Sequence, residues 1–294
     1  MSITGLHHVT ATSGPPGPNV DFYSGALGLS LVKRTVNFDD PGVYHLYFGD
    51  AAGSPGTIMT TFPFPNARQG RAGVGATSAI TFSTPDPAAR AAALTAARVE
   101  VRETERFGNP VWRFVDPDGM ALELVAGPDA IAGVTLWLAD PEPTARLLTE
   151  VFGYQAGEEV QEDGGTRLRL TLPGDAPGRV VDLWRSTGAA SPARGGAGSV
   201  HHIAFRARDH AHQDALAEAA RAAGLQVTER RDRQYFESVY FREPGGVLFE
   251  IATDAPGFAV DEPADALGQV LKLPPWLESY RPRIEAVLPT IPAH

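Results

Sequence analysis

The chain has 294 residues, 43% of them hydrophobic and 20% charged, so two domains with substantial cores are expected. Its 35 acidic residues outnumber 25 basic ones, and the formal net charge of −10 disfavours nucleic acid and anionic membrane surfaces as partners. Cysteine is absent, which excludes a disulfide, a thiolate metal site and a thiol nucleophile, so any metal must be held by nitrogen and oxygen atoms.

One unit recurs along the chain: an apolar strand, an amphipathic helix, and strands that close on a Pro/Gly turn. In the first two copies the hydrophobic periodicity predicts an opening strand, a helix and a closing strand at residues 6–10, 19–27 and 55–60, and at 77–82, 87–97 and 117–123. In the last two copies they are expected at 134–138, 143–151 and 177–182, and at 200–204, 213–223 and 244–250. Each helix is expected to end at or just before a glycine that forms a left-handed cap.

Four copies of this unit indicate an α+β protein of two domains. Copies one and two are expected to form a domain over residues 1–130, and copies three and four a second domain over 131–260. Residues 261–294 follow as a C-terminal tail without a fifth copy, in which 276–287 favours a short helix. The alternative interpretation is four unrelated strand–helix–strand segments.

Aligning the copies brings out a candidate metal site. In the opening strands His8 aligns with His202, whereas copies two and three have Ala79 and Gly133 there. In the closing strands the aligned residues are Thr60, Glu123, Asp182 and Glu250. If copies one and four face each other, His8, His202 and Glu250 converge, and Thr60 stands where a fourth ligand could be. Two histidines and one carboxylate with open coordination positions are typical of non-haem Fe(II) oxygenases.

Each candidate histidine belongs to a pair, His7-His8 and His201-His202. Strand alternation places the members of a pair on opposite faces, but the period alone does not say which member faces the cleft. A His-His pair can also serve packing alone, although two pairs at matching points of a repeat favour a site. No histidine accompanies Glu123 and Asp182, so their cleft is interpreted as a metal-free duplicate.

Several longer runs resemble the hydroquinone ring-cleaving dioxygenases of the vicinal oxygen chelate superfamily, and the resemblance covers nearly the whole chain. The runs in the first copy are residues 5–10 (GLHHVT), 31–40 (LVKRTVNFDD), 44–50 (YHLYFGD) and 55–62 (PGTIMTTF). The runs in the fourth copy are residues 200–205 (VHHIAF), 235–240 (YFESVY) and 244–250 (PGGVLFE). One departure is Gln234, because the residue before Tyr235 is usually smaller in that family.

The resemblance implies four βαβββ modules in the glyoxalase/bleomycin-resistance/extradiol dioxygenase fold, with a site built from the first and last modules. It implies Fe(II), with Mn(II) or Zn(II) as the other possible ions, held by His8, His202 and Glu250. It also carries over five residues around the metal ligands, which match by residue type. These are His7, Thr10, His201, Arg233 and Tyr240.

The expected reaction is cleavage of the ring of a small aromatic diol of hydroquinone or catechol type with O2. A para-diol can offer the metal only one oxygen, so the protein must stabilise the distal oxygen. Tyr240 and His201 are candidates for hydrogen bonding to substrate or oxygen and for general acid/base catalysis, and Arg233 could neutralise developing negative charge. The simpler alternatives to these roles are that Arg233 is a solvated surface charge and that Tyr240 only packs in the core.

Two other functions fit the same scaffold. One is a glyoxalase-like metal-dependent isomerase or lyase, in which a redox-inert ion acts as a Lewis acid, although such enzymes usually have a fourth protein ligand and Thr60 is a poor one. The other is a non-catalytic small-molecule binding protein, which would generally lack the metal ligands.

The remaining expectations are less specific. His45 lies in an alternating strand and is expected to be packed or hydrogen-bonded, and His210 and His212 are expected to be exposed at a helix start. The first residues lack a basic segment followed by an apolar one, and no stretch approaches about 20 apolar residues, so a cytoplasmic protein is expected. We also expect a homo-oligomer.

Overall fold

The structure is a computed structural model that describes residues 2–162 and 164–291, so Met1, Asp163 and the last three residues of the predicted tail lie outside it. Its first module contains β1 (Leu6–Ser13), α1 (Pro16–Val20), a π-helical segment η1 (Asp21–Ala26), β2 (Ser30–Asn37), β3 (Asp40–Gly49) and β4 (Ile58–Pro63). The second contains β5 (Ala76–Thr84), α2 (Pro87–Ala96), β6 (Arg102–Arg106), β7 (Asn109–Val115) and β8 (Ala121–Ala126).

The last two modules repeat this order. The third contains β9 (Ala130–Trp137), α3 (Glu142–Glu150), β10 (Gln155–Glu162), β11 (Gly165–Thr171) and β12 (Val180–Ser186). The fourth contains β13 (Ser199–Ala207), α4 (His210–Ala222), β14 (Arg231–Asp232), β15 (Glu237–Arg242) and β16 (Leu248–Thr253). The tail adds the 3₁₀ turns η2 (Phe258–Val260) and η3 (Glu278–Tyr280) and the helix α5 (Arg281–Val287). The α+β class and the four βαβββ modules are therefore confirmed.

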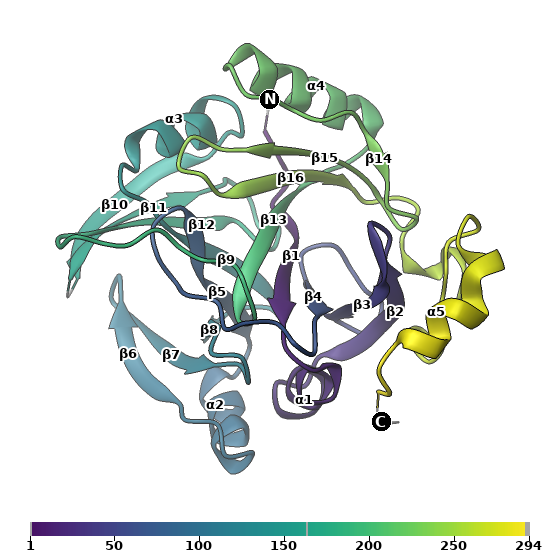
Figure 1. Cartoon of the computed structure of the whole chain (residues 1–294). Coiled ribbons are helices and arrows are strands. Elements are labelled where there is room, and N and C mark those ends of the chain that lie inside the picture. Colours follow the sequence, from purple (N-terminus) through teal and green to yellow (C-terminus); the bar gives the residue numbers. More distant parts are fainter. Residues whose placement is uncertain (1, 163, 292–294) are drawn as a thin grey trace.

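The modules pair into two curled eight-stranded sheets that lie side by side (Figure 1). One sheet joins modules four and one in the order β14-β15-β16-β13-β1-β4-β3-β2, and we call it the histidine sheet. The other joins modules three and two in the order β10-β11-β12-β9-β5-β8-β7-β6, and we call it the arginine sheet. The hydrogen-bonded sheets thus combine modules one with four and two with three, and the division at residues 1–130, 131–260 and 261–294 stays a proposal.

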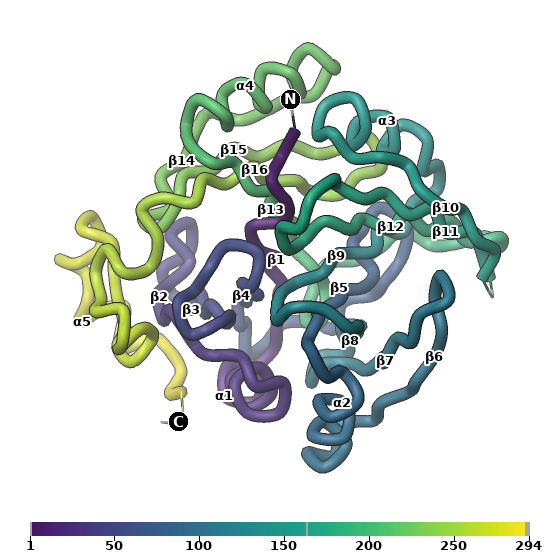
Figure 2. Tube along the Cα trace, turned by 180° about the vertical axis from the view of Figure 1, so that it is seen from behind, coloured from purple at the N-terminus to yellow at the C-terminus, as the bar shows by residue number. Residues whose placement is uncertain are grey.

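Helices α1 to α4 lie on the outside of the sheets (Figures 1 and 2). The tail with α5 lies beside β2 and β3, at that end of the histidine sheet. Large apolar side chains fill the space between the sheets and these helices, among them the mutually contacting rings of Phe152, Phe205 and Phe249. Among the described residues, no helix has both the length and the apolar character needed to cross a membrane.

The strand register confirms the alignment of the copies. Each closing strand pairs in parallel with the opening strand of its own module, and the aligned closing residues occupy the same place in all four. The pairs are Thr10 with Thr60, Thr81 with Glu123, Thr135 with Asp182, and Ala204 with Glu250. Two residues before each first member stand His8, Ala79, Gly133 and His202, as the sequence alignment predicted.

Strict strand alternation fails at the histidine pairs. Where β1 and β13 run antiparallel, the register shifts between Leu6 and His8 and again between Thr10 and Ala11, so His7 and His201 are each an extra, bulged residue. A β-bulge bends the strand and re-aims the neighbouring side chain. The two members of a pair therefore do not simply point to opposite faces.

Most helix ends agree with prediction, with one correction. Gly28, Gly153 and Gly224 follow the first, third and fourth helices with φ of 77°, 80° and 88°, the left-handed conformation expected of a cap. The second helix has no such glycine, and Arg98 takes that conformation instead with φ 65°. The first helix begins at Pro16 rather than at residue 19, because proline is well suited to the first turn of a helix.

Candidate metal centre

The predicted ligands converge at the middle of the histidine sheet. His8 on β1, His202 on β13 and Glu250 on β16 are all buried, and each offers a ligand atom within 4.8 Å of the others. Glu250 Oε2 lies 2.9 Å from Nε2 of His202 and 3.5 Å from Nε2 of His8. The convergence follows from the topology, because β16, β13 and β1 are neighbours in the sheet although they lie far apart in the sequence.

The charge of Glu250 suits a cation at this point. Burial raises the pKa of this carboxyl, but the imidazoles of His8 and His202 outweigh burial and hold its pKa well below the ordinary value. Burial also lowers the pKa of His202, which favours the neutral imidazole that binds metals. Oε2 of Glu250 is buried and accepts no hydrogen bond from any described residue. A buried carboxylate oxygen that faces two imidazole nitrogens fits a divalent metal ion.

The first histidine of each pair orients the second. Nδ1 of His7 lies 2.9 Å from Nδ1 of His8, and Nδ1 of His201 lies 2.7 Å from Nδ1 of His202. Each contact needs one proton, and a ligand that binds metal through Nε2 carries its proton on Nδ1. Nδ1–H of His8 and of His202 would therefore donate to Nδ1 of His7 and of His201. The single ring proton of neutral His7 and His201 is then on Nε2.

The two orienting histidines differ in exposure. His7 is 2% exposed, and burial lowers its pKa well below the ordinary value. His201 lines the cavity above the ligands, and burial together with His202 lowers its pKa to about 4. Both are neutral near pH 7, so His201 can present an N–H donor to a molecule in the cavity.

Glu250 has a further partner that the sequence analysis missed. Ser238 on β15 is buried and donates a hydrogen bond to Glu250 Oε1, which leaves Oε2 directed at the two imidazoles. The residue lies twelve positions before the ligand, and only the pairing of β15 with β16 brings it near. A serine in an alternating strand gives no signal of this role in a single sequence.

A cavity of about 380 Å³ opens above the three candidate ligands. Its walls combine aromatic rings with a few polar groups, as expected of a small-molecule site. The aromatic rings are those of Phe38, Phe62, Phe64, Phe236, Tyr47 and Tyr240, and the polar side chains include Asn37, Asp39, His45, Arg231 and Arg233.

Tyr240 and Arg233 form one wall of the cavity. Arg233 Nε donates to the Tyr240 hydroxyl at 3.0 Å, and Arg233 Nη1 pairs at 3.1 Å with Asp39, which also lines the cavity. The Arg233 side chain is only 18% exposed, so it is not a solvated surface charge. Burial and then Glu250 raise the pKa of Tyr240, which keeps its hydroxyl protonated and able to donate.

Thr10 and Thr60 lie beside the candidate metal ligands and are hydrogen-bonded to each other. Thr60 Oγ1 donates to Thr10 Oγ1 at 2.9 Å, and Nε2 of His45 lies 2.8 Å from Thr60 Oγ1. Thr60 is thus engaged at the position where a fourth ligand could have stood. His45 is hydrogen-bonded, as expected, but it also lines the cavity, which its strand pattern did not indicate.

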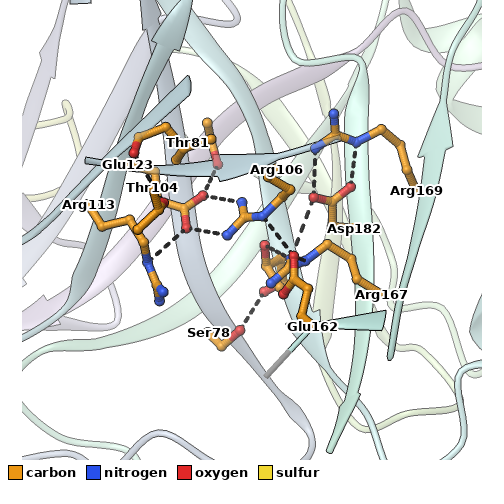
Figure 3. A network of polar contacts seen from close by, with 12 residues as sticks. Ser78, Thr81, Thr104, Arg106, Arg113, Glu123, Glu162, Arg167, Arg169 and Asp182 are labelled. Carbon is orange, nitrogen blue, oxygen red and sulfur yellow. Dashed lines mark hydrogen bonds and ion pairs between the residues drawn. The ribbon is translucent and has the colours of Figure 1, made fainter. Parts of the chain in front are cut away.

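The equivalent carboxylates of the arginine sheet are held by arginines (Figure 3). Arg106 donates to both oxygens of Glu123 at 2.7 and 2.8 Å, and Arg169 donates to both oxygens of Asp182 at 2.8 and 2.9 Å. Glu162 lies between them and accepts hydrogen bonds from Arg106 and Arg167. Guanidinium groups therefore pair with these carboxylates, in place of the imidazoles that face Glu250.

One minor expectation is wrong. His210 is exposed, but His212 is only 5% exposed, because it lies in the first turn of α4 against the backbone. Asp209 caps this turn and accepts a hydrogen bond from the His212 amide at 2.8 Å, while the Arg208 amide donates to the His212 ring.

Comparison with known proteins agrees with this geometry. A family model described as the Glyoxalase/Bleomycin resistance protein/Dioxygenase superfamily matches residues 5–124 and 130–251. Over 302 residues the chain is 42% identical to "Putative ring-cleaving dioxygenase MhqO" of Bacillus subtilis (strain 168), covering 96% of this chain and 94% of that protein. Over 303 residues it is 33% identical to Chlorohydroquinone/hydroquinone 1,2-dioxygenase of Sphingobium indicum, covering 95% and 94%.

A solved structure shares the complete fold. It is described as a "putative dioxygenase from Bacillus subtilis subsp. subtilis str. 168", and it is 40% identical to this chain. The two structures superimpose with a TM-score of 0.94 over 100% of this chain and 99% of the other.

Proposed function

The chain belongs to the Glyoxalase/Bleomycin resistance protein/Dioxygenase superfamily, and from this premise we propose that it is an Fe(II)-dependent dioxygenase that cleaves the ring of a hydroquinone-type aromatic diol with O2. The observation that carries the proposal is the buried group of His8, His202 and Glu250. Two imidazoles and one carboxylate leave several coordination positions of a bound ion open. The cavity of about 380 Å³ above them accommodates a single aromatic ring.

The proposed roles follow from the contacts. His8, His202 and Glu250 would hold Fe(II), which when bound would pass electrons from the aromatic diol to dioxygen. His7, His201 and Ser238 orient these ligands. Orientation by such partners fixes the tautomer and direction of each ligand.

Other residues would act on the substrate. Arg233 holds the Tyr240 hydroxyl at 3.0 Å, so Tyr240 keeps its own proton for donation to a substrate oxygen. The positive charge of Arg233 stabilises negative charge on that oxygen. His201 also lines the cavity and offers a second donor, and the phenylalanine rings of the cavity exclude water from the reacting groups.

The structure favours this function over the two alternatives. A glyoxalase-like isomerase usually has a fourth protein ligand, whereas the only carboxylate or imidazole ligands that converge among the described residues are His8, His202 and Glu250. Thr60, at the fourth position, hydrogen-bonds Thr10 and His45 instead. A binding protein without chemistry would not need a complete buried set of metal ligands.

Oxygen consumption separates the three functions. Protein loaded anaerobically with Fe(II) is expected to consume O2 with hydroquinone, methylhydroquinone or catechol, while Zn(II)-loaded protein is not, because zinc has no redox chemistry. Mn(II)-loaded protein tests whether that ion substitutes for iron. Absence of uptake together with turnover of a glutathione hemithioacetal by Ni(II)-loaded protein would instead assign the isomerase. Metal binding without either activity would assign the binding protein.

We also propose that the protein acts in the cytoplasm as a homo-oligomer. The acidic composition and the absence of cysteine support the first proposal. Light scattering of the purified protein tests the second, and cell fractionation tests the first.

A further inference from the structure

The cavity contains a second tyrosine that corresponds to Tyr240 by internal symmetry. On the paired strands β15 and β16, Tyr240 lies opposite Glu250. On the paired strands β3 and β4, Tyr47 lies opposite Thr60, the counterpart of Glu250. Since β1 and β13 are adjacent at the centre of the sheet, Tyr47 and Tyr240 approach the metal ligands from opposite walls.

The two tyrosine hydroxyls have opposite hydrogen-bonding arrangements. Tyr240 accepts a hydrogen bond from Arg233, so it remains a donor toward the cavity. Thr60 donates to Thr10, so it accepts from Nε2 of His45 at 2.8 Å, and the other ring nitrogen of His45 carries no proton. Tyr47 therefore donates to Nδ1 of His45 at 2.8 Å, and its oxygen retains acceptor capacity.

The surroundings hold Tyr47 and His45 in this state. Tyr47 is 1% exposed and packs against Tyr235, Phe236 and Phe258, and the ring of His45 lies 4.1 Å from the Tyr47 ring. Burial lowers the pKa of His45 well below the ordinary value and raises the pKa of Tyr47 well above it. The pair therefore stays neutral, with the proton on the tyrosine.

We propose that Tyr47, positioned by His45, accepts a hydrogen bond from the substrate hydroxyl that does not reach the metal, and so selects aromatic diols with a distal O–H group. The proposal rests on the proposed function, because it concerns the same cavity. An aromatic ring bound between the two walls meets a donor in Tyr240 and an acceptor in Tyr47. A hydroxyl satisfies this acceptor, whereas a methoxy group or a hydrogen atom leaves it unpaired, which costs binding.

Binding to Zn(II)-loaded protein tests this without turnover. Isothermal titration calorimetry gives dissociation constants for hydroquinone, 4-methoxyphenol and phenol. We expect the unaltered protein to bind hydroquinone roughly five- to tenfold more tightly than 4-methoxyphenol or phenol, as one hydrogen bond of about 1 kcal/mol predicts. Tyr47→Phe should reduce this ratio to about one. Tyr235→Phe is the matched control, because its hydroxyl bonds Asp261 at 3.1 Å away from the cavity, and it should keep the preference.

Variants of His45 separate positioning from packing. His45→Ala frees the Tyr47 proton for donation to a methoxy oxygen, so the preference over 4-methoxyphenol should be lost. His45→Gln keeps an acceptor and a donor and should restore part of this preference. Zinc content and thermal unfolding show whether each variant is folded. If Tyr47→Phe fails to fold, the His45 variants test the role of Tyr47 in its place.

The outcomes also separate this inference from the proposed function. An unchanged ratio in Tyr47→Phe, or an unaltered protein that binds the three compounds equally, overturns the role of Tyr47 even if the Fe(II)-loaded protein consumes oxygen. A ratio that depends on Tyr47 in a protein without oxygen uptake keeps the hydroxyl-binding site and removes the dioxygenase.

Discussion

The histidine sheet and the arginine sheet have the same strand register but treat their central carboxylates differently. Glu250 in the first and Glu123 in the second are equivalent and buried. Two imidazoles face Glu250 and leave a cavity above it, whereas the guanidinium of Arg106 binds both oxygens of Glu123. A buried carboxylate needs a positive partner, which arginine supplies in the arginine sheet and which a metal ion would supply in the histidine sheet.

The difference extends to the neighbouring strand. The residue opposite the carboxylate position is Tyr47 or Tyr240 in the histidine sheet, and Arg113 or Arg169 in the arginine sheet. Tyrosine adds a hydrogen-bonding group without charge, so it can act on a substrate, while arginine neutralises the carboxylate directly. The two sheets show how one register supports either a cavity above candidate metal ligands or a buried ion-pair network.

Gly133 shows that the arginine sheet cannot become a second metal site by a simple substitution. It occupies the position of His202 in the third module. A Cβ atom at this residue would lie 2.3 Å from the backbone oxygen of Val180, closer than real Cβ atoms come to backbone. No side chain fits there without a shift of β12, so the metal-free interpretation of this cleft has a steric basis.

The sharpest test of the comparison replaces the equivalent glutamates one at a time. Glu250→Gln removes the negative ligand, and we expect Fe(II) or Zn(II) affinity to fall more than 100-fold and oxygen uptake to disappear, since loss of a partner of a ligand already costs 10- to 100-fold. Glu123→Gln is the matched control and should keep one metal ion per chain. Metal analysis after dialysis measures both, and equal metal loss in both variants would contradict the assignment.

A second test breaks the arginine network. Arg106→Met leaves Glu123 buried without the guanidinium that donates to both of its oxygens. We expect the free energy of unfolding to fall by about 3–5 kcal/mol. The Arg106 and Glu123 side chains are 7% and 1% exposed, so solvent cannot compensate. Adding Glu123→Gln should recover a large part of the loss because it removes the buried charge. Urea unfolding measures the stability of the single and the double variant. If the double variant recovers no stability, the loss comes from packing and not from the unpaired charge.

The sequence predicted the two sheets unequally. The candidate metal ligands could be found because β1, β4, β13 and β16 carry motifs that align between modules, and the register fixes the matching positions. Ser238, Tyr47 and the arginines lie on the middle strands, where hairpins of variable length hide the register in a single sequence. Their roles depend on which strands pair, so His45 could be expected to be hydrogen-bonded but not to face the metal centre.

The histidine bulges show a second limit. Alternation predicts side-chain direction only in a regular strand, and His7 and His201 are each an extra residue in the pairing of β1 with β13. Bulges depend on contacts between strands that are almost 200 positions apart. The sequence therefore left open which member of each pair is the candidate metal ligand, and the resemblance to a family was needed to choose.

A smaller effect is expected from pH. Burial raises the pKa of Glu123, but hydrogen bonding and charge from Arg106 prevail and lower it below the ordinary 4.5. The unfolded chain therefore takes up this proton first, so the stability from the ion pair is complete above about pH 4.5 and is lost as pH falls through the folded pKa. Urea midpoints between pH 7 and pH 3.5 should fall less steeply for Glu123→Gln than for the unaltered protein. Parallel curves would show that other carboxylates control acid unfolding.

The smallest effect is expected at the exposed edge of the same network. Arg113 Nε lies 3.6 Å from Glu123, but the Arg113 side chain is 54% exposed, so water already solvates its charge. Arg113→Ala should change the free energy of unfolding by no more than about 0.5 kcal/mol, as is usual for an exposed ion pair. Arg106 and Arg113 carry the same charge and both contact Glu123, but they differ in burial. The ratio of the two losses in the free energy of unfolding therefore measures the effect of burial. A loss at Arg113 as large as that at Arg106 would show that Glu123 depends on both arginines equally.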